Sequence, residues 1–444
     1  VLLADDYMVE QSSDLVRRLV PGKKEGVVFE ASAPPRSKPN SEGFGFYGNV
    51  IHNGSHFLMY QRRDGHVGLA LSEDGFSWNK TGLLTHMKES AIMRVGKFGG
   101  EMCVQYDANA SNPEQRWIAG ARCDTSELCL LYSSDGVAWH FANHAWGRAT
   151  DTYPCVYKEG DDYTAIIRQD FGSKAAWRAI RGVQVLQGRS DSIKSLQLHM
   201  ASDWYLDMYG KDEWRRRSIY ALTRTKYGDM YLGLAQMYEF PYGQTERDPP
   251  WSTDYMQPYL VTSRDGKTFD LGWTRRTPLV PRGGPDDFDH GCILTAADWV
   301  TYNGYHWLYY AGWNARHEEK HEMEAKIGLI RWEQDRIVEI APLAAHTAGR
   351  LLTRSFLLPP GAAGLKVDAK CSKGDLVAAK LTAAEPSREL ASGAVRCPLD
   401  AHGESIGLKF ARGQGWGAIE NTTLRLEFTL KGRASLFGFE FSVA

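Results

Sequence analysis

One short pattern, written three times, limits what this chain can fold into. An apolar stretch leads into Ser-x-Asp-Gly in ALSEDGFSW from Ala70, LLYSSDGVAW from Leu130 and YLVTSRDGKTF from Tyr259. An Asp-Gly pair between β-forming stretches is a strong hairpin signal, because both residues tolerate the positive φ of a tight turn. Three copies predict a repeated β unit rather than a single hairpin.

A second pattern, a glycine turn followed by an apolar strand, accompanies the first. It occurs in HNGSHFLMYQ from His52, KFGGEMCVQY from Lys97, KEGDDYTAII from Lys158, KYGDMYLGLA from Lys226 and YNGYHWLYYAG from Tyr302. We interpret each copy as the turn after the innermost of four strands, with the Asp-Gly turn before the outermost. Two units have degenerate outer turns, at Gly188–Ser192 and Arg331–Arg336.

The two patterns predict an all-β fold: a five-bladed β-propeller followed by a C-terminal β-sandwich. Radial repetition protects the edge strands of the blades, and an array of sandwiches would not produce five similar units in series. Beyond Pro342 the chain changes to short alternating strands punctuated by Gly and Pro. We therefore expect a lead-in segment over 1–27, the propeller over 28–342 and the sandwich over 343–444.

Composition narrows the classes of partner. The net charge is −2 and the pI is near 6.7, which argues against a nucleic-acid partner, since such proteins carry a basic surplus. No apolar run approaches the roughly 20 residues that a membrane-spanning helix needs, so no membrane span is expected. Aromatic residues make up 12% of the chain, a content that suits both β-structure and stacking on sugars.

The cysteines and sequons favour a secreted, glycosylated protein. Four asparagines begin N-x-[ST] sequons: Asn53, Asn79, Asn109 and Asn421. Of the seven cysteines, Cys371 could pair with Cys397, and Cys123 with Cys129. The other three lie in apolar strand patterns and are interpreted as buried thiols: Cys103, Cys155 and Cys292.

Carboxylates recur at the start of the innermost strand in every expected blade, where propellers form a funnel. The successive segments contain Glu42, then Glu89, then Asp151, then Asp203 and Asp207, and finally Asp286, Asp287 and Asp289 with His290. Polar caps on strand ends are the alternative for any one of them. Together they fit glycoside hydrolysis, in which one carboxyl group is protonated and another is ionised.

Aromatic residues beside these carboxylates could stack on sugar faces, although packing between blades is an equal alternative. They are Phe46, Tyr47, Tyr153, Trp204, Tyr205, Tyr209 and Trp313. The carboxylates and aromatics together predict an oligo- or polysaccharide as the partner.

The architecture and the VGLALSEDGFSW stretch resemble the invertase, levanase and arabinanase group of five-bladed propeller glycoside hydrolases, over residues 28–444. The resemblance implies that Asp151 holds substrate hydroxyls and tunes the acid, that Glu42 is the nucleophile or base, and that Asp207 or Asp203 is the acid. The W-x-N-D-P-N-G, R-D-P and E-C motifs of invertase-type enzymes do not occur here. A carbohydrate-binding propeller without catalysis therefore remains an alternative.

Arginines in the third expected blade suggest a further alternative. Arg168, Arg178 and Arg181 could bind a uronate carboxylate or a sulfate ester, or they could pair with the carboxylates between blades. With His290 or His317 as base, the same arginines would fit a polysaccharide lyase. The lyase would release an unsaturated product, whereas the hydrolase would release only reducing ends.

No cofactor is expected. HEEKH, from His317 to His321, matches the string of a zinc protease but has no helical pattern around it. Asp286, Asp287 and Asp289 could hold Ca²⁺ or form a plain acidic turn. The expected site thus comprises Glu42, Asp151 and Asp207 as catalytic residues. The expected substrate-binding residues are Tyr47, Arg168, Arg178, Trp204, Asp289, His290, Trp313 and His317.

Overall fold

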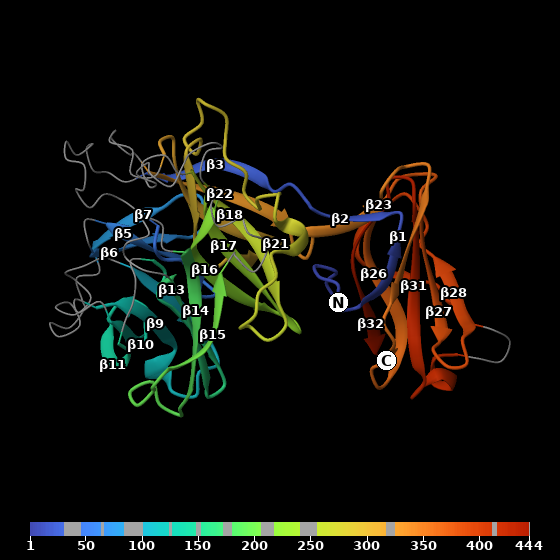
Figure 1. The fold of residues 1–444 in the computed structure, drawn as a ribbon, viewed down its shortest axis with the longest axis horizontal. Coiled ribbons are helices and arrows are strands. Elements are labelled where there is room, and N and C mark those ends of the chain that lie inside the picture. The colour runs from blue at the N-terminus through green and yellow to red at the C-terminus, as the bar shows by residue number, and fades with distance from the viewer. Residues whose placement is uncertain are drawn as a thin grey trace. The chain divides into compact units, whose positions relative to one another are not determined.

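The computed structural model of the chain is nearly all β (Figure 1). It describes residues 1–30, 46–63, 66–83, 101–123, 127–147, 152–171, 180–205, 217–239, 255–316, 325–410 and 415–443. Within these ranges the helical elements are short 3-10 turns: η1 (Pro113–Gln115), η5 (Gly272–Thr274) and η6 (Trp416–Ile419). None of the described helices is long and apolar enough to cross a membrane.

The chain divides into two compact units. The larger unit spans Gly22–Arg331, and the smaller unit combines Val1–Pro21 with Trp332–Ala444. The expected lead-in segment thus belongs largely to the smaller unit, and the second boundary lies near residue 331 instead of 342. Strand pairing between the two ends of the chain causes this difference, and pairing over such a distance leaves no local signal.

Three sheets of the larger unit have four antiparallel strands each, in chain order. The first contains β4 (Val50–His52), β5 (Phe57–Arg63), β6 (His66–Ser72) and β7 (Asn79–Leu83). The second contains β8 (Met102–Tyr106), β9 (Trp117–Arg122), β10 (Leu128–Ser133) and β11 (His140–Trp146). The third contains β12 (Cys155–Glu159), β13 (Asp162–Phe171), β14 (Ile180–Arg189) and β15 (His199–Tyr205).

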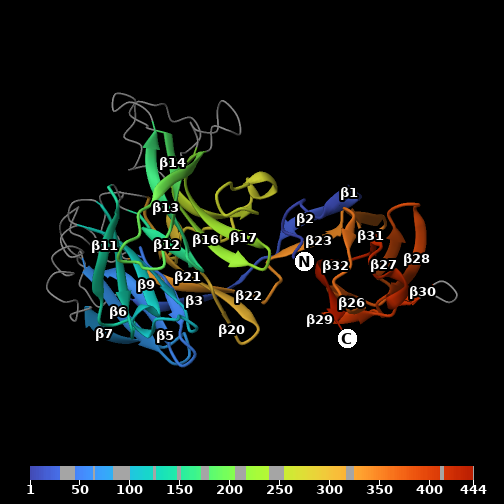
Figure 2. The ribbon, with the colours of Figure 1, turned by 90° about the horizontal axis from the view of Figure 1, so that it is seen from below.

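A fourth, eight-stranded sheet completes the larger unit. It runs through β16 (Arg217–Tyr227), β17 (Met230–Glu239), β18 (Tyr255–Ser263), β19 (Cys292–Thr295), β21 (Tyr305–Trp313), β22 (Lys326–Glu333) and β3 (Lys23–Glu30), with β20 (Val300–Tyr302) beside β21. The strands contact one another in cyclic order: β4 to β8, β8 to β12, β13 to β16, β17 to β19, and β20 back to β4. Figure 2 labels strands from each of the four sheets, among them β5, β9, β13 and β17.

The first two Ser-x-Asp-Gly turns lie between the third and fourth strands of their sheets, as the sequence predicts, and the third follows β18 and leads to an isolated bridge between Thr262 and Asp270. In the first copy the Ser72 hydroxyl accepts a hydrogen bond from the Gly75 N–H at 2.8 Å. Asp74 Oδ1 accepts from the next two backbone N–H groups at 2.8 and 2.7 Å, and Gly75 has a φ of 76°. The other two copies repeat these bonds. The motif therefore recurs because each residue stabilises the same turn.

Three of the expected strand assignments are wrong. The segment EMCVQY forms β8, the first strand of its sheet, and is not a second strand after a glycine turn. Asp203 and Trp204 lie on β15, the outer strand of the third sheet, rather than on an inner strand. The fourth strand beside β22 is β3, from the N-terminal part of the chain, and does not follow a turn at Arg331–Arg336.

The smaller unit consists of two antiparallel sheets. One contains β1 (Val9–Ser13), β24 (Ala348–Thr353), β31 (Thr423–Lys431), β27 (Leu376–Ala383), β28 (Arg388–Ala394) and β30 (Lys409–Phe410), with β25 (Phe356–Leu357) beside β31. The other contains β2 (Leu15–Leu19), β23 (Val338–Pro342), β32 (Ser435–Val443), β26 (Ala362–Cys371) and β29 (Leu399–Ile406). Alternate residues of both sheets enter one shared core, including Val367, Leu381 and Leu426.

Six cysteines form three disulfides. The expected pairs Cys371–Cys397 and Cys123–Cys129 are confirmed. The interpretation of Cys103 and Cys155 as thiols is wrong, because they form a disulfide that joins β8 to β12. Cys292 is a buried thiol, as expected.

Candidate functional site

Each of the five repeating groups of strands in the larger unit begins with one strand, which we call its first strand: β4, β8, β12, β16 or β19. The beginnings and the ends of these strands define two sides of the larger unit. We call the side on which β4, β8, β12, β16 and β19 begin the start rim, and the side on which they end the end rim. Several chain ranges outside the described residues connect strands at the start rim, among them 31–45, 148–151 and 206–216. Five residues expected in the site fall in such ranges and thus lie outside the described residues: Glu42, Asp151, Arg178, Asp207 and His317.

Three tyrosines from three first strands or their leading residues meet at the start rim. The hydroxyls of Tyr47 and Tyr220 are 2.7 Å apart, and the ring centroids of Tyr47 and Tyr153 are 6.0 Å apart. Tyr153 is buried, and its hydroxyl donates to the carbonyls of Phe46, at 3.0 Å, and Thr295. Tyr153 therefore ties first strands together, whereas Tyr47 is only partly buried.

Arg168, one of the expected substrate-binding residues, lies beside this tyrosine cluster. It is 7% exposed, and its guanidinium lies 5.1 Å from the ring centroid of Tyr220. Tyr47 and Arg168, which are 121 positions apart, thus both contact Tyr220. A guanidinium on an aromatic ring is attracted by the ring quadrupole and keeps its edge for hydrogen bonding.

Two start-rim carboxylates were missed by the sequence analysis. Glu101 directly precedes β8 and is 1% exposed. Glu239 ends β17, and its carboxylate accepts hydrogen bonds from the Tyr259 hydroxyl and, at 2.5 Å, from Gln257 Nε2. Burial, with the Glu239 charge, raises the pKa of Tyr259, so this hydroxyl stays a donor. Neither glutamate belongs to a motif that sequence reasoning could have recognised.

Guanidinium groups gather on the tyrosines next to Glu239. Arg217, at the start of β16, lies 5.2 Å from the ring centroid of Tyr259. Arg282 and Arg316 lie 3.7 and 4.9 Å from the ring centroid of Tyr255. This part of the start rim therefore combines a carboxylate, aromatic rings and three cations, a set that can bind a hydroxylated and partly anionic molecule.

His290 lies in this region, whereas Asp289 does not fit the role expected of it. The His290 carbonyl accepts a hydrogen bond from Arg282 at 2.7 Å, and its ring Nδ1 is 3.3 Å from the Gly283 carbonyl. Asp289 is 2% exposed and is paired with Lys24 Nζ at 2.6 Å and the Tyr310 hydroxyl at 3.0 Å. The expectation that Asp289 binds substrate is wrong, because this buried carboxylate joins β3 to β21.

The two expected tryptophans are largely enclosed. Trp204 is 1% exposed and packs against Phe269, with ring centroids 6.0 Å apart. A ring so deeply buried cannot stack on a sugar, so its expected binding role is wrong. Trp313, at the end of β21, is 9% exposed.

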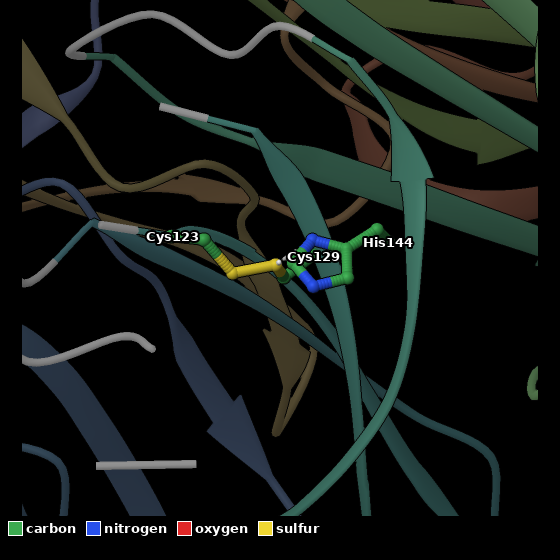
Figure 3. A group of neighbouring side chains, drawn as sticks. All are labelled: Cys123, Cys129 and His144. Atoms are coloured by element: carbon green, nitrogen blue, oxygen red, sulfur yellow. Dashed lines mark hydrogen bonds between the residues drawn. A yellow bond between two sulfur atoms is a disulfide. The ribbon is translucent and has the colours of Figure 1, made fainter. Parts of the chain in front are cut away.

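One group of candidate metal ligands occurs in the described part of the larger unit. Asp286, Asp287 and Asp289 do not bring their carboxylates together there as one group of ligands. Cys123, Cys129 and His144 do lie together (Figure 3). The two sulfur atoms are joined in a disulfide and are not thiolates, so this group lacks the donors that a metal ion needs.

Comparisons with known proteins found no matching family model and no matching curated protein. Among solved structures, the chain is similar to a family 43 arabinoxylan arabinofuranohydrolase from Bacillus subtilis in complex with cellotetraose. The identity is 9%, the coverage is 94% of this chain and 99% of that chain, and the TM-score is 0.43.

Two further structures are similar at the same level. A glycosyl hydrolase from Bacteroides ovatus has 11% identity, coverage of 74% of this chain and 98% of that chain, and a TM-score of 0.45. A thermostable family-43 glycoside hydrolase has 12% identity, coverage of 67% and 92%, and a TM-score of 0.42. All three are glycoside hydrolases, and the likeness is a distant one.

Proposed function

We propose that this chain is a carbohydrate-active protein that hydrolyses a glycosidic bond at the start rim. One observation carries the proposal: the start rim gathers Tyr47, Tyr220 and Tyr255 with Glu239 and several guanidinium groups. Aromatic rings that stack on sugars, combined with a few convergent polar groups, are typical of saccharide sites. The underlying fold is proposed to be a five-bladed propeller with a C-terminal sandwich, and the cyclic strand contacts support it.

The proposed chemistry uses two carboxyl groups on opposite sides of the scissile bond. One protonates the leaving oxygen, and the other attacks the sugar or activates water. Asp151 and Asp207 with Glu42 remain our catalytic candidates, because the ranges that contain them begin and end at start-rim strands. Glu239 is added as a positioning or substrate-binding residue, since Gln257 and Tyr259 donate hydrogen bonds to its carboxylate and fix its orientation.

A polysaccharide lyase is the second candidate, and a specific observation favours it. Arg217, Arg282 and Arg316 lie on two neighbouring tyrosines of the start rim. Guanidinium groups bind carboxylates bidentately and could neutralise a uronate before proton abstraction. His290 would then be the candidate base.

Secretion with N-glycosylation is also proposed. Three disulfides support it, since disulfides persist in oxidising compartments. Asn79 and Asn421 are exposed, as glycan attachment requires. Treatment with a glycosidase that removes N-glycans should lower the apparent mass of the protein secreted by eukaryotic cells, and an unchanged mass would contradict the proposal.

The activity test is a panel of neutral and anionic polysaccharides, followed by reducing-end release and ultraviolet absorbance together. Hydrolysis predicts new reducing ends without an absorbance increase, and loss of the reducing-end release in Asp151→Asn. The matched control is Glu73→Gln, which alters an exposed carboxylate in the turn after β6. An absorbance increase would establish the lyase instead, and binding without any product would leave a carbohydrate-binding propeller.

A further inference from the structure

A pocket opens at the end rim of the larger unit, on the side opposite to the start rim. It has a volume of about 620 Å³ and is lined at the end rim by the ends of β4, β8 and β12 and by Asp298–Val300. Every residue around it lies in the described part of the chain. Its volume is in the range of small-molecule sites, which is roughly 300 to 1,000 Å³.

The pocket wall carries two cations that form no ion pair with any described residue. Arg116 and Lys158 both line it, and no carboxylate in the described ranges forms an ion pair with either. Arg116 Nε is enclosed and makes no hydrogen bond to a described residue. The Lys158 ammonium lies 5.8 Å from the ring centroid of Tyr163. A cavity whose wall holds two unneutralised cations attracts an anion.

Asp298 does not cancel this charge below neutral pH. Its Oδ1 accepts hydrogen bonds from the Thr225 hydroxyl and, at 2.7 Å, from the Trp299 N–H. Burial nevertheless raises the pKa of Asp298 to about 7. At pH 6 the remaining lining carboxylate is Asp107, whose Oδ1 accepts a hydrogen bond from the Asn109 N–H at 2.9 Å.

Neutral polar groups also line the pocket. Asn109 and Gln115 bring side-chain amides, which can donate to and accept from hydroxyl groups. We propose that the end-rim pocket binds a small anionic saccharide, whose oxyanion contacts Arg116 and Lys158 and whose hydroxyls contact Asn109 and Gln115. The site is separate from the start rim, and the proposal does not depend on the proposed catalytic function.

Calorimetric titration of the full chain at pH 6 tests this proposal with three probes. Glucuronate and glucose 6-sulfate carry a carboxylate and a sulfate on a similar ring, and glucose carries neither. Measurable binding is expected for at least one anion and not for glucose. Equal binding of glucose, or binding of none of the three at millimolar concentration, would overturn the proposal; the two anions distinguish carboxylate from sulfate recognition.

Substitution of the cations locates the site. The double variant Arg116→Gln, Lys158→Met should weaken anion binding at least tenfold, and both side chains are partly exposed, so folding should be retained. Lys194→Met, which changes an exposed lysine elsewhere in the larger unit, should bind like the unsubstituted protein. Unchanged affinity in the double variant would place the anion elsewhere and overturn the proposal.

The pH dependence gives an independent readout. Asp298 shares the wall with Arg116, Lys158, Asp107 and His52 and contacts Thr225 of β16. As the pH rises from 6 to 8 its ionisation adds a negative charge, so anion affinity should fall. Asp298→Asn should bind equally at both pH values, and an unchanged fall in that variant would contradict the assignment to this pocket.

Discussion

At the residue scale, tyrosine hydroxyls connect neighbouring sheets through the Asp-Gly turns. The Tyr60 hydroxyl on β5 donates to the Gly136 carbonyl at 2.8 Å, and the Tyr309 hydroxyl on β21 donates to the Gly75 carbonyl at 3.0 Å. A Cβ at Gly136 would lie 2.7 Å from the Tyr60 hydroxyl oxygen. Glycine is therefore required twice at this turn, by the positive φ and by the close approach of the neighbouring sheet.

Tyr60→Phe should lower the free energy of unfolding by about 1 kcal/mol, because the buried Gly136 carbonyl loses one of its two donors and keeps the Trp139 indole N–H at 3.0 Å. Urea unfolding followed by fluorescence measures the change. Tyr305→Phe is the matched control, since this ring is 39% exposed. Equal losses in the two variants would show that the buried hydrogen bond adds nothing to stability.

Asp298 makes a second residue-scale prediction, on the pH dependence of stability. Its pKa is about 7 in the folded chain and near the ordinary value of 3.8 when unfolded. Between these values the folded chain holds a proton that the unfolded chain releases, so stability falls as the pH rises from about 4 to about 7. Above pH 7 the loss is complete.

Asp298→Asn removes this titration and keeps an acceptor for the Thr225 hydroxyl. The variant should gain stability relative to the unsubstituted protein as the pH rises, reaching roughly 1 to 3 kcal/mol at pH 7.5 after allowance for partial exposure. Urea unfolding at a series of pH values measures the difference. A difference that does not vary with pH would contradict the raised pKa.

At the element scale, β3 holds the eight-stranded sheet through a buried ion pair. Lys24 of β3 binds Asp289, and Arg331 of β22 binds Glu25 of β3 with Nε at 3.0 Å. Lys24→Met should destabilise the larger unit by about 3 kcal/mol, because the Asp289 charge stays buried without its cation. Adding Asp289→Asn should recover part of the loss in thermal unfolding, and no recovery would contradict the pairing argument.

The Cys103–Cys155 disulfide links two first strands and closes a long loop. Its cysteines are 52 residues apart, against 6 for Cys123 and Cys129. In the chain-entropy description, replacing both cysteines with Ala should cost about 4 kcal/mol for the first pair and about 2 kcal/mol for the second. Denaturant midpoints under non-reducing conditions test the order, and a larger cost for the short loop would contradict it.

At the scale of the whole molecule, local sequence patterns predicted turns and strands well, but they did not predict strand pairing between distant parts of the chain. The Ser-x-Asp-Gly turns, the strands after most glycine turns and two disulfides follow from neighbouring residues in the sequence. Three strand pairs join segments about 300 residues apart: β3 with β22, β1 with β24, and β2 with β23. No local pattern encodes that choice, because several strands present similar edges.

In the candidate site, too, local sequence patterns predicted some residues, and contacts between distant strands determine the others. Tyr47 and His290 lie just before first strands, as their sequence context suggests, whereas Arg168 lies on β13, the second strand of its sheet. Substrate binding by these three residues stays a prediction. Asp289 has the same sequence context, but burial beside Lys24 gives it a structural role. Glu239 went unnoticed because its relation to Arg217 depends on Tyr259, which lies on a third strand.

The most direct test of the central claim is a crystal structure of Asp151→Asn with an oligosaccharide from the substrate panel. The account predicts sugar density at the start rim, with a ring against Tyr47 or Tyr255 and hydroxyls near Glu239. Density that avoids the start rim and occupies only another surface of the larger unit would contradict the account.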